Sequence, residues 1–116
     1  MEIDDYNGDR VIFYEATRIK KAKKRPELRE KSFLNGQLRE AINSPWRIYE
    51  DFDRPKERRV YYCKEYSTRE KTQYTKVVVE ISTKPFVIIT AYRPDRIKEE
   101  SETSKSKKIY DSEKHQ

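Results

Sequence analysis

The sequence predicts an α+β protein, with two N-terminal helices packed on a four-stranded antiparallel sheet and a disordered C-terminal tail. Three observations predict this class. Residues 75–92 hold the densest run of apolar and β-branched side chains and fit two strands joined near Pro85. Two helical patterns and two alternating strand patterns precede that run. After residue 98 almost no apolar side chains follow, as is typical of disorder.

The N-terminal segment is expected to lead into the first helix. Residues 1–9 form a loose lead-in, and residues 11–14 are either a short strand or a hydrophobic staple before the helix. The helix is predicted over residues 15–24, where alanine and isoleucine recur every three residues. Pro26 disfavours helical backbone at Arg25, so the helix should end at that residue or just before it.

The remaining elements alternate helix and strand patterns. A second helix is predicted over residues 32–43, with leucine, alanine and isoleucine on one face, and Pro45 follows its end. Residues 46–52 and 59–66 alternate between two faces, as strands do. Short polar turns join these strands to the two strands in residues 75–92, which favours an antiparallel meander.

Length and composition predict one small domain over residues 1–98 and a tail over residues 99–116. Only 34% of the 116 residues are hydrophobic, so the core should be thin. Cys63 is the single cysteine, and no apolar run approaches the roughly 20 residues of a membrane helix. We therefore expect a soluble, cytoplasmic protein without a membrane partner. One cysteine, one histidine (His115) and two glycines predict no metal site and no cofactor.

The positive charge of the chain is concentrated near its N-terminus. Residues 10–31 carry nine Lys or Arg residues against three acidic ones, which accounts for the whole formal net charge of +6. A focused basic patch attracts phosphate backbones. A solvated helix face that keeps a thin-cored protein in solution explains the same charge equally well.

Several short motifs occur in the order found in one known family. They are Pro26-Glu27-Leu28, Pro45, Tyr61-Tyr62, Val77-Val78-Val79 and Thr90-Ala91-Tyr92, followed by Ile97-Lys98. In this order they resemble the small bacterial and phage proteins with the barnase/EndoU/colicin/RelE-like nuclease fold. The resemblance implies a toxin-like ribonuclease. Two positions depart from the family pattern, since Arg25 replaces a histidine and Glu80 replaces a lysine.

The residues that match or depart from these motifs provide candidate catalytic groups. RNA cleavage without metal needs a base, an acid and cations near the phosphate. Arg25 stays protonated and suits phosphate binding, although a solvated helix end is an equal explanation. Glu80 is a candidate base, with a simple ion pair as the preferred alternative. Tyr92 and Thr90 share a strand face, where their hydroxyls either contact substrate or cap the core.

Further residues are candidates for binding RNA. Lys21 and Lys24 belong to the basic patch, and Lys76 and Arg93 place positive charge close to Glu80 and Tyr92. Tyr62, or its neighbour Tyr61, is a candidate for stacking on a base.

Three functions agree with the sequence. The first is a metal-independent endoribonuclease of the toxin type that acts by 2′-hydroxyl attack. The second is an RNA-binding module of the same fold that has lost catalysis, as the replacements at Arg25 and Glu80 suggest. The third is a protein-interaction domain whose basic helix meets an acidic partner such as an antitoxin. Salt-dependent RNA binding separates the first two functions from the third.

Overall fold

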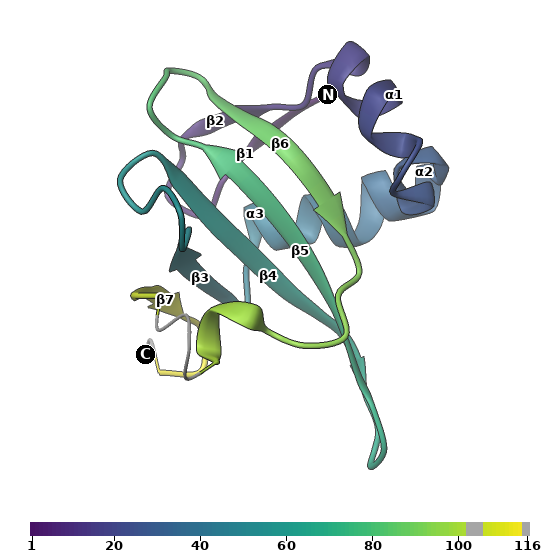
Figure 1. Cartoon of the computed structure of the whole chain (residues 1–116), viewed down its shortest axis with the longest axis vertical. Coiled ribbons are helices and arrows are strands. Elements are labelled where there is room, and N and C mark those ends of the chain that lie inside the picture. Colours follow the sequence, from purple (N-terminus) through teal and green to yellow (C-terminus); the bar gives the residue numbers. More distant parts are fainter. Residues whose placement is uncertain (102–105, 115–116) are drawn as a thin grey trace.

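The apolar strands predicted near residues 75–92 form the middle of a curled, seven-stranded sheet (Figure 1). The computed structural model describes residues 1–101 and 106–114. Across the sheet the strands follow the order β1 (Glu2–Asp4), β2 (Arg10–Ile12), β6 (Phe86–Tyr92), β5 (Thr72–Glu80), β4 (Arg58–Ser67), β3 (Arg47–Glu50) and β7 (Lys108–Asp111). The four strands expected from the sequence are the four consecutive strands β3 to β6.

The predicted fold class, with a four-stranded antiparallel sheet, is wrong in strand number and in strand direction. β2 runs parallel to β6, with Val11 opposite Phe86 and Ile12 opposite Val87. β1 turns back on β2 after Gly8, whose φ of 84° is a backbone conformation that suits glycine. β1, β2 and β7 each bury a single residue. Such short edge strands carry too little alternation for a pattern to predict them.

The N-terminal helical segments lie partly behind the sheet and partly to the right of β6 in Figure 1, and their buried residues share one core with one face of the sheet. The first segment contains α1 (Glu15–Ala22) and the 3₁₀ helix η1 (Pro26–Arg29). The second runs without a break through α2 (Lys31–Phe33), the π-helical η2 (Leu34–Leu38) and α3 (Arg39–Asn43). These helices are short, and their apolar side chains complete one core with the sheet.

The two faces of the sheet differ in what covers them. On the helical face, Tyr61 and Cys63 of β4 join the main core. Alternate residues point the opposite way, so Tyr62 lies on the other face, in a small cluster with Tyr49 and Val60. We call this second face the open face, because the N-terminal helices leave it uncovered. Among the described residues, no helix is long and apolar enough to cross a membrane.

The described part of the C-terminal segment is structured, so the prediction of a disordered tail is wrong there. The 3₁₀ helix η3 (Lys98–Glu100) lies on the open face, and β7 forms the sheet edge (Figure 1). Ile97 packs against the open-face cluster, and Glu99 is only 4% exposed. Charged contacts and the packing of Tyr110 against Tyr6 and the main core also hold this segment. His115 lies outside the described residues.

Candidate active site

A row of paired residues crosses the open face. Tyr92 of β6 lies opposite Lys76 of β5, and Lys76 lies opposite Tyr62 of β4. Tyr62 in turn lies opposite Arg47 of β3, which pairs with Asp111 of β7. Residues opposite one another in antiparallel strands project on the same face, with Cβ atoms about 5 Å apart. Strand register therefore aligns aromatic rings and charges across five strands, and we call these five residues the central row.

Lys76 lies between Tyr92 and Tyr62 in the central row and is 7% exposed. Its Nζ lies 2.9 Å from Glu99 Oε2. The same atom is 6.0 Å from the ring centroid of Tyr62 and 5.8 Å from that of Tyr92. A buried ammonium is costly without a partner. The carboxylate of Glu99 and the two electron-rich ring faces together stabilise the charge of Lys76.

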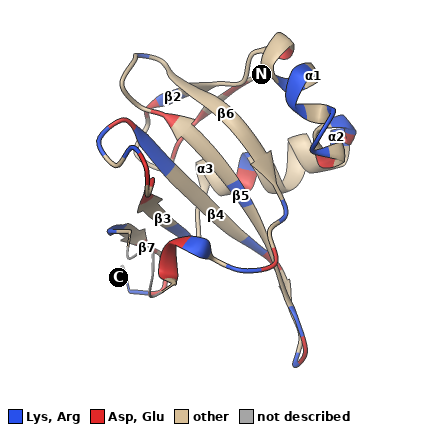
Figure 2. Cartoon of the chain, in the orientation of Figure 1, with Lys and Arg blue, Asp and Glu red and all other residues tan. Residues whose placement is uncertain are grey.

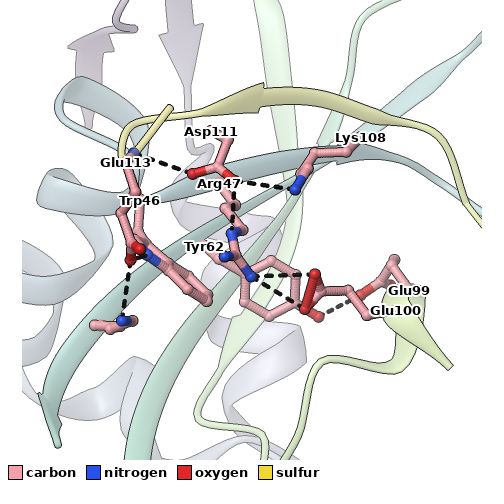
Figure 3. Close-up of polar contacts among 9 residues, drawn as sticks. Trp46, Arg47, Tyr62, Glu99, Glu100, Lys108, Asp111 and Glu113 are labelled. Carbon is pink, nitrogen blue, oxygen red and sulfur yellow. Dashed lines mark hydrogen bonds and ion pairs between the residues drawn. The ribbon is translucent and has the colours of Figure 1, made fainter. Parts of the chain in front are cut away.

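Tyr62 acts as a hydrogen-bond donor in this row. Its hydroxyl donates to Glu99 Oε1, a contact visible in Figure 3. Burial of the ring, followed by the hydrogen bond to Glu99, raises the pKa of Tyr62 far above its usual value. The buried ring packs edge to face with Tyr49 and Tyr74, at centroid distances of 5.9 and 6.4 Å. A fully buried ring offers no face to a nucleobase, so this geometry suits donation rather than stacking.

Arg25 extends the row beyond β6. Its guanidinium carbon lies 3.8 Å from the ring centroid of Tyr92. Pro26 begins η1, and the backbone of Arg25 takes φ −126° and ψ 85°, away from the helical region. This break between α1 and η1 brings the guanidinium to the end of β6. A guanidinium stacked on a ring keeps its in-plane N–H groups available to a phosphate.

The end of α1 and the second half of β6 line a cationic pocket of about 390 Å³. Along β6, β2 pairs only with Phe86 and Val87, so α1 can approach the later residues of β6. We call this the α1 cation pocket, and its lining residues are Lys20, Lys21, Lys23, Lys24, Arg25 and Thr90. Within the described part of the chain, none of its five cations forms an ion pair. Figure 2 shows this positive charge on α1 and the acidic residues of η3 at the other side of the open face.

Glu80 lies away from the central row. It is four residues from Lys76 along β5, a distance of about 13 Å. Arg58 Nε donates to its carboxylate at 3.0 Å, and the Ser82 hydroxyl donates at 2.6 Å. The hydrogen bond from Ser82 and then the contacts with Arg58 lower the pKa of Glu80. Glu80 therefore forms a cross-strand ion pair, which was the preferred alternative to its role as a base.

Arg93 is also held by acidic residues. Its Nε donates to Glu65 at 3.1 Å, and its guanidinium lies 3.7 Å from Glu30. Its backbone N–H donates to Glu27, and its guanidinium carbon is 4.8 Å from the ring centroid of Phe33. These contacts tie the end of β6 to η1 and α2. Arg93 is therefore placed to fasten the helices to the sheet.

Pattern reasoning missed the residues at the far end of the row. Arg47 donates to Glu100 at 3.1 Å and to Asp111 at 3.2 Å, and its guanidinium carbon lies 4.0 Å from the Trp46 ring centroid (Figure 3). Glu99 and Glu100 belong to the segment predicted to be disordered. The sequence contained one signal for Arg47, because the alternation of β3 places this residue on the same sheet face as Tyr49. No group of three His, Cys, Asp or Glu side chains that could hold a metal ion occurs among the described residues.

Comparison with protein families identifies the class of this fold as a nuclease of the Barnase–EndoU–Colicin–RelE type. The matching family model is PBECR2, described as phage-Barnase-EndoU-ColicinE5/D-RelE like nuclease2, and it spans residues 2–110. The chain belongs to this family, and the resemblance predicted from the motifs is confirmed. The match reaches from β1 into β7, so it includes the edge strands and Glu99. No curated protein and no solved structure matches the chain.

Proposed function

We propose that the protein is a metal-independent endoribonuclease of the toxin type, which cleaves RNA by attack of a 2′-hydroxyl on the adjacent phosphate. The α1 cation pocket carries this proposal, because its cations form no ion pair with the described residues and adjoin Tyr92 and the central row in a chain of a nuclease family. Phosphates are attracted to such a concentration of positive charge. Single-stranded RNA would follow the pocket and reach Lys76.

The proposed roles follow from position. Lys21 and Lys24 bind the phosphates that flank the cleaved bond, and Arg25 binds the scissile phosphate. Arg25 and Lys76 stabilise the extra negative charge of the phosphorane as the 2′-oxygen bonds to phosphorus. Solvent water accepts the proton of the attacking 2′-hydroxyl, and the Tyr92 hydroxyl donates a proton to the departing 5′-oxygen. Thr90, in the wall of the pocket, orients the sugar–phosphate backbone through its hydroxyl.

A second candidate function is RNA binding without cleavage. One observation favours it: Glu80 and Glu99, two carboxylates of the open face that could accept the 2′-proton, are both engaged. Glu80 is paired with Arg58, while the oxygens of Glu99 are bonded to Lys76 and Tyr62. The cation pocket would then hold RNA without a base to start the reaction.

A third candidate is docking of an acidic protein, such as an antitoxin, on α1. Ile19 is 53% exposed on this helix, next to the lysines of the pocket. An apolar anchor beside unpaired cations suits an acidic, partly apolar surface. If the protein is a ribonuclease of the toxin type, this partner would block the path of RNA.

The test is RNA cleavage by purified protein in EDTA, with Arg25→Ala and a matched variant, Arg54→Ala. Arg54 pairs with Glu57 in an exposed turn, so its removal causes the same charge change far from the pocket. We expect wild-type cleavage, a loss of roughly 100-fold in Arg25→Ala and little change in Arg54→Ala. Binding without cleavage supports the second candidate. If the protein neither binds nor cleaves RNA, the acidic protein partner remains as the candidate.

A further inference from the structure

The carboxylate of Glu99 occupies a small, fully formed anion site on the open face. Lys76 Nζ lies 2.9 Å from one of its oxygens, and the Tyr62 hydroxyl donates to the other. Lys76 and Glu99 are 7% and 4% exposed, so this contact is sheltered from water. Two donors that bind the two oxygens of a carboxylate also suit two non-bridging oxygens of a phosphate.

We infer that Lys76 and Tyr62 form a binding site for one phosphate group of the substrate, and that Glu99 fills this site as an internal substitute when no RNA is bound. The identity of the ligand as RNA rests on the proposed function. The site lies in the central row beside Tyr92, so a strand that enters from the α1 cation pocket reaches it next. The η3 segment must then lift from the sheet.

The energetics of this exchange favour one anion replacing another. Removing Glu99 alone would leave a buried ammonium without a partner, which is costly. A phosphate that enters as Glu99 leaves keeps Lys76 neutralised throughout. Other contacts that hold η3 include the packing of Ile97, the pairs between Arg47 and Glu100, and the hydrogen bond from the Ser106 N–H to the Glu99 carbonyl at 3.3 Å.

The experiment compares wild type, Glu99→Gln and the matched control Glu100→Gln. Glu100 lies on the same segment, so its substitution causes the same charge change, but its carboxylate contacts Arg47 instead of Lys76. The first measurement is the Kd of a 2′-O-methyl RNA oligonucleotide, which resists cleavage by 2′-hydroxyl attack. The second is the rise in melting temperature caused by inorganic phosphate.

We expect Glu99→Gln to bind the oligonucleotide roughly tenfold tighter than wild type, and Glu100→Gln to stay within about twofold. Phosphate should raise the melting temperature of Glu99→Gln more than that of the other two proteins. Adding Tyr62→Phe to Glu99→Gln removes one donor and should abolish the phosphate effect. If Glu99→Gln does not fold, Glu99→Asp, whose shorter side chain withdraws the carboxylate, replaces it in the same comparison.

Equal gains in Glu99→Gln and Glu100→Gln would overturn the inference, since general electrostatics would explain both. Unchanged or weaker RNA binding by Glu99→Gln, without selective stabilisation by phosphate, would overturn it as well and mark the pair as purely structural. If none of the three proteins binds RNA but phosphate selectively stabilises Glu99→Gln, the phosphate site is supported and the proposed function is contradicted.

Discussion

Lys76 is the one lysine or arginine among the described residues that is buried. Its burial on the open face follows from its register between Tyr62 and Tyr92. Pattern reasoning identified all three residues as candidates, because each stands in a recognisable strand. It missed Glu99, which pairs with Lys76 across 23 positions of sequence. Alternation along one strand carries no information about a partner from a distant segment.

The Lys76–Glu99 pair predicts a stability effect that depends on which partner is removed. Glu99→Ala leaves a buried ammonium unpaired and should lower the free energy of unfolding by about 3–5 kcal/mol. The double variant Lys76→Met/Glu99→Leu replaces both charges with apolar groups and should be close to wild type. Urea denaturation checks both values. A double variant as unstable as Glu99→Ala would show that the charges themselves stabilise the fold.

At the scale of elements, the end of α1 gathers several cations that form no ion pair with the described residues. Lys20 and Lys21 lie in its last turn, where positive charge also favours the helix dipole. Arg25 lies outside the helix, so the dipole explains none of its placement. The basic patch was visible in the sequence, but its position beside Tyr92 was not. That position depends on the parallel pairing of β2 with β6.

Replacing Lys21 and Lys24 by alanine tests the role of α1 in RNA binding. If both lysines contact phosphates of single-stranded RNA, affinity falls and the plot of log K against log salt becomes shallower by about 1.4. The control is Arg54→Ala/Lys56→Ala, which removes two cations from the exposed turn before β4. Titrations at several salt concentrations provide the slopes. An equal change in slope for both double variants would contradict a specific role for α1.

The edge strand β7 shows why the predicted strands were incomplete. Its sequence KIYD buries only Asp111, so it carries no apolar alternation. Ionic contacts to Arg47 and Lys108, at 3.2 and 2.9 Å, hold the Asp111 side chain instead. In contrast, β5 and β6 are rich in valine and isoleucine, and their positions were predicted within a few residues. Apolar content locates central strands, while charge pairing locates this edge.

The ionised side chain of Asp111 predicts that the contribution of β7 to the stability of the fold depends on pH. The hydrogen bond from Lys108 is the main cause that lowers the pKa of Asp111 below its usual 3.8. A carboxylate with a lowered folded pKa contributes stability above its unfolded pKa and loses that contribution as the pH falls through the folded value. Asp111→Asn should therefore be less stable than wild type at pH 7, and the gap should narrow as the pH falls below the usual carboxyl pKa of 3.8.

Urea denaturation midpoints at pH 7 and at about pH 3 check this expectation. Asp53→Asn, in the exposed turn before β4, makes the same chemical change and should show no such gap. If the difference in stability between Asp111→Asn and wild type stays constant with pH, its cause is packing rather than ionisation.

At the scale of the whole molecule, the two faces of the sheet carry different groups of residues. One face of the curled sheet carries the helices and the main core, while the other carries the central row. The motifs in the sequence were sufficient to predict the nuclease family. They were not sufficient to predict a seven-stranded mixed sheet, because the pairing of β2 with β6 and of β7 with β3 joins segments far apart in the chain.

The most direct test of the account compares an RNA oligonucleotide with its DNA counterpart, incubated with purified protein in EDTA, with the products weighed by mass spectrometry. Attack by the 2′-hydroxyl predicts that RNA is cut into fragments ending in 2′,3′-cyclic phosphate, while DNA stays intact. Tyr92→Phe should slow the cut without changing its products. Cleavage of both nucleic acids, RNA fragments with 5′-phosphates, or an intact RNA would contradict the account.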